Sequence, residues 1–396
     1  MGAVSAFGAG ADLLWQQLCS GASGIRPLRH TDAGRLRVRV AAQVPEAFDP
    51  ADYIADRTLE MLDRFSQFAL IAANEAIRQS GLDFTSGQLS ARSGVVIGSG
   101  VGGELTHDEQ YRRLYQENAA RLNPLTIARL MTNAPASQIS IAHGLRGPAF
   151  VVASACASSN HAIALSMQMI RAGLADVIIA GGTEACLCYG SLRAWEAMRV
   201  LADDTCRPFS ANRRGLVLGE GAGVFVLESL AHADARGAVA LGELAGAGMS
   251  SDARDIVAPD AGGASMAMAL ALADAGLSVQ DIDYINAHGT GTRANDVVET
   301  RAIHEVFGSH AGRLAVSSTK SMHGHALGAA GALELVAVLG AMRDGMVPPT
   351  ANFDAADPEC DLDYVPNVAR RLHVRGALSN SFAFGGLNAV LAVTRV

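Results

Sequence analysis

The chain has 396 residues, of which 49% are apolar, 18% are charged and 42 are glycine. Such a composition is typical of tightly packed α/β layers, and the length is enough for a large core divided into two or three domains. The net charge of −8 argues against general nucleic-acid binding, so an acidic partner would need a local basic patch.

Three features of the sequence indicate where the protein is located in the cell: its apolar runs, the start of the chain and its cysteines. The most apolar helix expected covers residues 328–342, which is too short to span a bilayer, and it contains Glu334. No basic region followed by an apolar stretch opens the chain, so no secretion signal is expected. Six cysteines show no pairing pattern, and Cys186 and Cys188 lack the second cysteine pair of a zinc site. We therefore expect a cytoplasmic protein.

The first regular elements form a helix, a strand and a glycine-rich loop. Apolar residues from Phe65 to Ala76 recur at helical spacing, the helix is expected to end at Gly81, and a strand follows at 94–98. The glycines at 98, 100 and 103 fit a dinucleotide-binding pattern. That pattern also requires a second strand that ends in an acidic residue about 20 residues later. Residues 111–120, which stand at that place, are polar and helical in character, so a dinucleotide site is not expected. We therefore predict that these glycines let the loop pack close beside the functional site.

Residues 148–170 are the most informative part of the chain. A β-branched apolar run predicts a buried strand, and a turn of small residues then leads into a helix whose first turn carries Cys156. Backbone N–H groups and the positive end of a helix dipole at such a turn lower a thiol pKa and can hold an oxyanion. A lone cysteine is more often an inert small hydrophobe, so this assignment depends on further motifs.

The second half of the chain repeats this plan. A helix is expected to end at Gly276, a strand follows at 283–286, and His288 stands directly after it within Asn-Ala-His-Gly-Thr-Gly-Thr at 286–292. His325 closes Lys-Ser-Met-His-Gly-His at 320–325, just before a Gly/Ala-rich helix. The helices after Cys156 and after His325 end in similar residues, at 170–174 and 342–346. Two similar β/α halves would bring their strand ends, and these reactive groups, to one site.

A metal centre is an alternative use of the same residues. His323 and His325 together with His288 and Cys156 offer enough ligand atoms for zinc. Neither histidine motif has the nearby carboxylate or cysteine partners that usually complete such a site, so no metal is expected.

The cysteine turn, the two histidine motifs and Asn-Ser-Phe-Ala-Phe-Gly-Gly at 380–386 together resemble the elongating β-ketoacyl-(acyl-carrier-protein) synthases of the thiolase superfamily. The resemblance spans the whole chain, and residues 154–163, 194–199, 204–210 and 347–352 look like the nodulation-type members. It implies an α/β, thiolase-like fold, a duplicated α-β-α-β-α sandwich. Residues 1–240 would carry the nucleophilic cysteine and residues 241–396 the two histidines.

Two further expectations follow from the resemblance. Family members normally begin with a strand that ends in Thr-Gly-x-Gly, and this chain opens just after the place of that strand. We therefore expect that either the start of the chain is placed too late or the first strand is missing. Family members are homodimers that meet edge to edge through the strand at residues 150–154.

The resemblance implies a decarboxylative Claisen condensation, in fatty-acid or specialised acyl-chain biosynthesis. Cys156 would accept an acyl group from acyl carrier protein, and His288 and His325 would donate N–H groups to the enolate formed from malonyl carrier protein. Lys320 and Glu334 would form a charge pair that orients His325. No resident cofactor is expected, because the phosphopantetheine arrives on the carrier protein.

Further roles are implied for the loops around the site. The backbone N–H groups of Cys156 and Phe384 would hold the second oxyanion, and Phe384 would also gate the pocket on a glycine hinge, although Ala383 replaces one usual glycine. The residues expected to bind substrate are Thr290, Thr292, Phe382 and Gly385. The residues expected to dock the carrier protein are Arg57, Arg64, Arg121, Arg193 and Arg199. Asp296 and Glu299 are expected on the solvated surface.

Two other members of this fold class remain as alternatives. A non-catalytic chain-length factor binds an acyl chain inside a heterodimer, but it typically has Gln in place of the nucleophile, whereas this chain has Cys156. A degradative thiolase would carry a second cysteine as base near its C-terminus, and residues 380–388 contain none.

Overall fold

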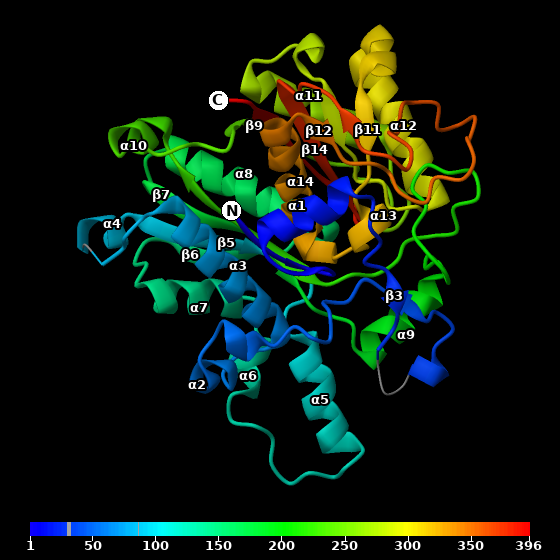
Figure 1. Cartoon of the computed structure of the whole chain (residues 1–396). Helices are drawn as coiled ribbons and strands as arrows, with labels where there is room; N and C mark the ends of the chain where they lie inside the picture. The colour runs from blue at the N-terminus through cyan, green and yellow to red at the C-terminus, as the bar shows by residue number, and fades with distance from the viewer. Residues whose placement is uncertain (30–32, 86) are drawn as a thin grey trace.

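The computed structural model describes residues 1–29, 33–85 and 87–396, which form two sheets covered and separated by helices (Figure 1). The α-helices are α1 (Ala11–Cys19), α2 (Asp56–Leu59), α3 (Arg64–Ser80), α4 (Gly87–Ala91), α5 (Glu104–Tyr115), α6 (Thr126–Leu130), α7 (Ala134–His143), α8 (Ser158–Arg171), α9 (Tyr189–Met198), α10 (Leu230–Ala235), α11 (Ala261–Ala275), α12 (Arg293–Phe307), α13 (Lys320–His323) and α14 (Ala330–Asp344). The strands are β1 (Gly2–Ser5), β2 (Gly8–Ala9), β3 (Arg26–Pro27), β4 (Val40–Ala41), β5 (Ser93–Gly98), β6 (Ala149–Val152), β7 (Val177–Glu184), β8 (Gly221–Glu228), β9 (Glu243–Ser251), β10 (Tyr284–Asn286), β11 (Ala315–Ser317), β12 (Met346–Val347), β13 (Arg370–Arg371), β14 (Gly376–Ala383) and β15 (Leu387–Thr394).

The two large sheets have the same topology, apart from the additional two-residue strand β2 at one edge of the first sheet. The first has the strand order β2-β1-β8-β7-β5-β6, in which β5 runs parallel to β6 and β7, and β7, β8 and β1 follow as antiparallel neighbours. The second has the order β11-β10-β14-β15-β9, in which β10 runs parallel to β11 and β14, and β15 and β9 follow as antiparallel neighbours. Each half therefore contributes one sheet with the same pattern of pairs, which confirms the duplicated unit.

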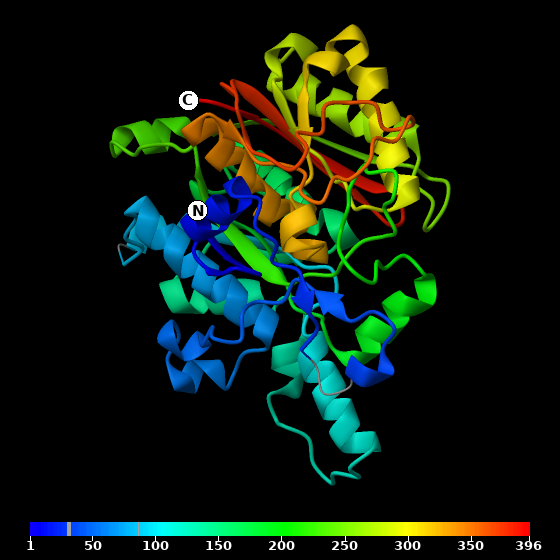
Figure 2. The same cartoon turned by 45° about the vertical axis from the view of Figure 1, so that its right-hand side comes forward.

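Five layers of helices and sheets build the molecule (Figures 1 and 2). The helices α8 and α14 pack against each other between the two sheets and contact strands of both. On the outer faces, α3 and α7 cover the first sheet, while α11 and its neighbour α12 cover the second. Helix α14 is buried from Ala330 to Met342, as expected for a helix at the centre of the molecule. The predicted α-β-α-β-α sandwich is confirmed.

The expectation that the first strand is missing is wrong. Residues Gly2–Ser5 form β1, fully buried, and pair antiparallel with β8, with Ala3 opposite Gly223. The strand occupies the place in the first sheet that β9 occupies in the second. It is only four residues long, against nine for β9, which is why the pattern at the chain start did not reveal it.

The glycine-rich loop after β5 packs beside the cysteine turn. A Cβ atom on Gly98 would lie 2.4 Å from the backbone carbonyl carbon of Ser158, and one on Gly100 would lie 2.8 Å from Glu184 Oε2. Such approaches leave no room for a side chain. The predicted packing role of these glycines is confirmed.

No helix in the described part of the chain is long and apolar enough to cross a membrane. All six cysteines are unpaired thiols.

Candidate active site

Cys156 lies in a strained turn between β6 and α8, at the place predicted for the nucleophile. The turn is a short 3-10 helix, Ala155–Ala157, and Ala155 has a left-handed backbone with φ 49°. The Ser158 hydroxyl stabilises the turn, because it donates to Ala155 O at 2.7 Å and accepts from Ser154 N–H at 2.9 Å. The thiol is almost completely buried, with 6% of the residue exposed. A rare backbone conformation beside a reactive group is typical of functional sites.

His325 contacts this thiol directly. Its Nε2 lies 3.0 Å from Cys156 Sγ, although the two residues are 169 positions apart. The loop that carries His325 is held by the segment before β8, since His325 N donates to Val217 O at 2.7 Å and Gly219 N donates to His325 O at 2.9 Å. The ring is 1% exposed. The imidazole therefore sits in a fixed position against the sulfur.

His288 completes the group from the end of β10. Its ring centroid lies 5.4 Å from that of His325, with the ring planes nearly perpendicular at 85°. The Glu299 carboxylate of α12 holds the backbone here, accepting from the N–H groups of His288 and Gly289, both at 2.8 Å. Phe382 closes another side, with its ring centroid 6.1 Å from that of His288. The structure thus brings together the cysteine and both histidines that the sequence singled out.

Lys320 forms the predicted charge pair with Glu334, but the expected link to His325 is wrong. The ammonium group contacts Glu334 Oε1, donates to the carbonyl oxygen of His288 at 2.6 Å and lies 3.4 Å from His288 Nδ1. Both members of the ion pair are fully buried. Lys320 is the single lysine among the 31 lysine and arginine residues of the chain. A compact ammonium can meet these three groups at one point, which a planar guanidinium cannot do in the same way. The pair therefore positions His288.

Burial sets the charge states of the three groups. Burial raises the pKa of the Cys156 thiol to about 12, and the Lys320 charge lowers it only in part. Burial, reinforced by Lys320, holds the pKa values of His288 and His325 well below the usual range. The backbone hydrogen bond of the turn lowers the thiol pKa, as expected, but desolvation of the sulfur outweighs it, so the net shift is upward. At neutral pH the site holds a thiol and two neutral imidazoles.

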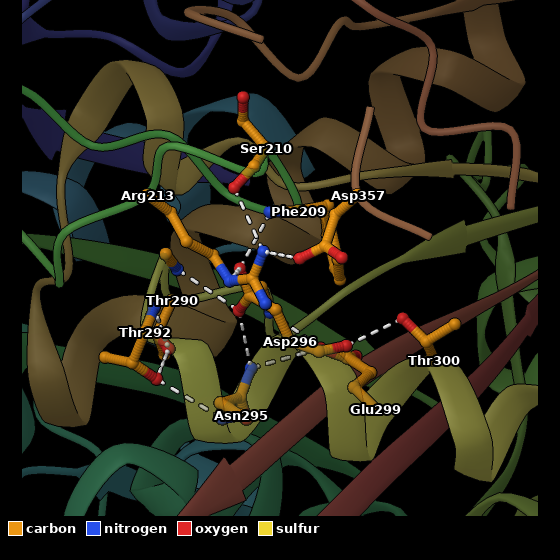
Figure 3. Close-up of polar contacts among 12 residues, drawn as sticks. Phe209, Ser210, Arg213, Thr290, Thr292, Asn295, Asp296, Glu299, Thr300 and Asp357 are labelled. Atoms are coloured by element: carbon orange, nitrogen blue, oxygen red, sulfur yellow. Dashed lines mark hydrogen bonds and ion pairs between the residues drawn. The ribbon is translucent and has the colours of Figure 1, made fainter. Parts of the chain in front are cut away.

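Asp296 and Glu299 are buried, so the expectation of a solvated surface is wrong. Figure 3 shows Asp296 at the centre of a polar cluster: it accepts from Phe209 N–H at 2.7 Å and from Gly291 N–H at 3.2 Å. Arg213, 3% exposed, lies with its Nε 3.6 Å from Asp296 Oδ2 and also pairs with Asp357. The cluster joins the loop before β8 to the loop after His288. In the sequence, the burial of Asp296 and Glu299 was indicated only by their spacing, since acids three residues apart lie on one face of the helix that follows the histidine motif.

Glu184 is a further buried residue that the sequence did not indicate. Its carboxylate accepts from the N–H groups of Gly100 and Gly328 at 2.7 and 3.0 Å and from the Ser99 hydroxyl at 3.0 Å. Burial raises the pKa of Glu184 to about 7, against the effect of these donors. It therefore ties the glycine-rich loop of the first half to the segment after His325 in the second half.

The residues expected to bind substrate lie around the histidines, with differing exposure. Thr290 is 5% exposed and its hydroxyl lies 2.9 Å from that of Thr292, which caps α12 by accepting from Asn295 N–H at 3.3 Å. Phe384 is half-buried and stacks on Trp195 of α9, with 5.9 Å between ring centroids. Gly385 has φ 81°, a conformation that favours glycine.

The five arginines expected to dock a partner do not form one surface. The Arg64 guanidinium forms an ion pair within the protein, with the buried Glu220 at 2.8 Å. Arg57 belongs to α2, Arg193 belongs to α9 and Arg199 caps the end of α9; in Figure 1, α2 is on the left and α9 on the right. Arg121 is exposed in the loop after α5.

The buried ion pair beneath His288 leads to a stability prediction. Lys320→Met is expected to lower the free energy of unfolding by about 3–5 kcal/mol, because it leaves the buried Glu334 carboxylate without its cation. In the double variant Lys320→Met with Glu334→Leu, most of that loss should be recovered while condensation stays low, since His288 still lacks its ammonium partner. Urea unfolding and product formation measured on both variants test this; equal stability of the single and double variants would contradict the role given to the pair.

Comparison with known proteins places this chain in a family. The model of the N-terminal domain of β-ketoacyl synthases matches residues 1–233, and that of the C-terminal domain matches residues 241–354. The chain is 50% identical to nodulation protein E of Rhizobium sp. (strain N33) over 396 residues, covering 100% of this chain and 98% of the relative. It is 41% identical to 3-oxoacyl-(acyl-carrier-protein) synthase 2 of Coxiella burnetii (strain RSA 493 / Nine Mile phase I), covering 100% of this chain and 97% of the relative.

A solved structure of similar fold contains a type II polyketide synthase acyl-carrier protein in complex with its ketosynthase. It matches with a TM-score of 0.90 and 30% identity, covering 100% of this chain and 98% of that chain. Together with the two domain matches and the cysteine with two histidines at the meeting point of the halves, this shows that the chain belongs to the β-ketoacyl synthase family and is an acyl-transferring condensing enzyme.

Proposed function

We propose that this protein is a β-ketoacyl-(acyl-carrier-protein) synthase that joins an acyl group held on Cys156 to the two-carbon unit of malonyl carrier protein. One observation carries the proposal: a buried thiol lies 3.0 Å from the Nε2 of one neutral imidazole, with a second neutral imidazole beside it. The phosphopantetheine of the carrier protein supplies the thioester, so no resident cofactor is needed.

The first step moves the acyl group onto Cys156. The sulfur attacks the carbonyl carbon of the acyl thioester, a new carbon–sulfur bond forms, and the bond to the carrier sulfur breaks. Because the thiol pKa is raised to about 12, the Sγ proton leaves as the bond forms and passes to the departing carrier thiolate, while the N–H of the adjacent His325 Nε2 donates toward the sulfur. The backbone N–H groups of Cys156 and Phe384 would hold the oxyanion of this step.

The second step makes the new carbon–carbon bond. Malonyl carrier protein loses carbon dioxide, and the negative oxygen of the resulting enolate accepts hydrogen bonds from the N–H groups of His288 and His325. The enolate carbon then attacks the acyl carbonyl on Cys156, the Cys156 thiolate leaves, and one proton from solvent restores the thiol. The product is a 3-oxoacyl carrier protein. Neutral imidazoles serve here as donors that need not lose or gain a proton.

The pathway is either fatty-acid synthesis or the synthesis of a specialised acyl chain. The chain is 50% identical to nodulation proteins E and 41% identical to 3-oxoacyl-(acyl-carrier-protein) synthase 2, which favours the specialised chain. The test is mass spectrometry of products formed from malonyl carrier protein and acyl primers of varied length and unsaturation. Products longer than the primer by one two-carbon unit support the proposal. If none of the tested acyl primers is extended, the proposal is rejected.

The same family resemblance supports a homodimer. The strand β6 is the outermost strand of the first sheet, and Phe150 within it is 37% exposed. An open strand edge of this kind is suited to pairing with a second copy.

Phe384 is proposed to gate the site. It stands between β14 and two glycines with positive φ, 81° and 68°, and its half-buried ring packs on Trp195. Phe384→Ala is expected to release carbon dioxide from malonyl carrier protein without condensation, and to cost clearly less than the about 3–5 kcal/mol typical of a fully buried phenylalanine.

Thermal unfolding and carbon dioxide release on the same variant test this gate. Phe353→Ala is the matched control, because Phe353 is also half-buried and stacks on Tyr364, outside the site. A large stability loss in Phe384→Ala without uncoupled carbon dioxide release would show a fixed core residue and no gate.

A further inference from the structure

The contact between Cys156 and His325 joins the two halves of the chain. Cys156 stands a few residues before the start of α8 or at its first turn, and His325 stands in the same place relative to α14. The two helices pack against each other between the sheets (Figure 1). The distance of 3.0 Å between Cys156 Sγ and His325 Nε2 therefore requires contacts that hold the first turns of these helices in one relative position.

Gly328 is the residue of the second half that makes such contacts. It lies three positions after His325 and is buried. Its N–H donates to Glu184 Oε2 at 3.0 Å, and its carbonyl oxygen accepts from the Ser159 hydroxyl. Ser159 lies three positions after Cys156, and Glu184 is the last residue of β7. Two side chains of the first half therefore fasten both backbone polar groups of one residue of the second half.

The packing around Gly328 is too close for any side chain at this position. A Cβ atom on Gly328 would lie 2.4 Å from Gly100 N and 2.7 Å from Glu184 Oε2. A Cβ atom on Gly182 of β7 would lie 2.1 Å from Ser159 Oγ and 2.7 Å from Gly328 O. Close-packed interiors of this kind transmit displacements because their atoms have no free space to move into.

A short and strained link connects Gly328 to the histidine. Only Ala326 and Leu327 separate it from His325 along the chain, and Leu327 has a left-handed backbone with φ 45°. A strained backbone persists only where the surrounding structure holds it in place. A shift of Gly328 would therefore move the His325 ring as well.

The two side chains that fasten Gly328 are themselves fixed. Both Glu184 and Ser159 are fully buried, with 0% of each residue exposed. The Glu184 carboxylate also accepts from the Gly100 N–H at 2.7 Å and from the Ser99 hydroxyl at 3.0 Å. Burying a carboxylate is costly unless hydrogen bonds replace its water. The condensation steps described above use neither side chain, so the reason for burying them lies in what they hold.

We propose that Glu184 and Ser159 are positioning residues that hold His325 Nε2 against Cys156 Sγ by fastening Gly328. The proposal rests on the proposed function for the step that it affects, which is acyl transfer onto Cys156. A misplacement of about 1 Å can lower a rate about a hundredfold. Loss of either side chain should therefore slow acyl transfer at saturating acyl carrier protein and leave the affinity for the carrier protein unchanged.

The test compares Glu184→Gln and Ser159→Ala, which add no volume, with a matched control. The control is Asp63→Asn, because Asp63 is a carboxylate of 2% exposure that caps α3 and accepts from the Thr106 N–H at 2.7 Å. Intact-protein mass against time should show acyl transfer slowed about tenfold or more in Glu184→Gln and Ser159→Ala, with little change in the carrier concentration that gives half the maximal rate. Asp63→Asn should react at the wild-type rate. Equal rates in the three variants would overturn the proposal.

The same changes in a His325→Ala background test whether they act through His325. Each should have little further effect there, because residues that act through one group are coupled and their effects do not multiply. A slowing in that background as large as in wild type would overturn the proposal. If urea unfolding shows that Glu184→Gln does not fold, the same comparison with Ser159→Ala decides.

A separate measurement distinguishes failure of the positioning from failure of the proposed function. If wild type takes up no acyl group, the proposed function fails. Alkylation of Cys156 by iodoacetamide, followed by digestion and mass spectrometry, then still tests the positioning. Because the His325 N–H stabilises the thiolate, Ser159→Ala should slow this alkylation. A rate equal to or above that of wild type would reject the positioning.

Discussion

Cys156→Ala is expected to abolish condensation while the free energy of unfolding changes by only about 1 kcal/mol. The sulfur is the only acyl acceptor at the site, and the replacement removes one buried atom from an apolar cluster. Labelled malonyl carrier protein and an acyl primer, with product followed by mass spectrometry and stability by urea unfolding, measure both effects. Condensation at the wild-type rate would remove Cys156 from the mechanism.

The variant Cys156→Gln separates the two steps further. It also lacks the acyl acceptor, but His288 and His325 remain to stabilise the enolate, so carbon dioxide release from malonyl carrier protein should be retained or raised. Loss of both condensation and carbon dioxide release, in a variant that still folds, would mean that the histidines do not act independently of the thiol.

His288→Ala and His325→Ala are each expected to lower condensation at least about a hundredfold, the usual effect of deleting an oxyanion donor. Acyl transfer onto Cys156 should fall less than condensation in His288→Ala. It should fall further in His325→Ala, because only His325 lies within 3.0 Å of the sulfur. Intact-protein mass after incubation with acyl carrier protein measures acyl transfer. A loss of acyl transfer equal to the loss of condensation in His288→Ala would contradict this division.

The pH dependence follows from the same geometry. A histidine whose folded pKa is held below its usual value takes up a proton only at lower pH, so both imidazoles stay neutral donors from about pH 6 to pH 8. In single-turnover experiments, the rate of condensation should therefore not fall through imidazole protonation as the pH is lowered from about 8 to about 6.

The elements that carry the site could be predicted because their signals are local. A strand, a small-residue turn and a helix place Cys156, and the structure has this order in β6, the turn and α8. The prediction that the strand is buried is wrong, because β6 lies at the edge of the first sheet and is partly exposed. The repetition of helix ends at Gly81 and Gly276, both left-handed with φ 69° and 65°, indicated the duplication, and the two sheets confirm it. Patterns of this kind depend only on neighbours along the chain.

The contacts that set the chemistry could not be predicted in the same way. That Lys320 reaches His288 and not His325 depends on how α13 packs against the end of β10, which no local pattern encodes. Glu299 is polar and stands on a helix, so the sequence favoured solvent, whereas the fold covers it and uses it to hold two backbone N–H groups. The raised pKa of Cys156 likewise results from burial by distant segments. Burial by tertiary packing decides all three.

The most direct test of the account follows the mass of the wild-type protein through one cycle. Incubation with acyl carrier protein alone should add one acyl group, and digestion should place it on Cys156. Addition of malonyl carrier protein should then return the protein to its original mass, with release of carbon dioxide and a carrier-bound product longer than the primer by two carbons. An acyl group found on another residue, or one on Cys156 that malonyl carrier protein does not remove, would contradict the account.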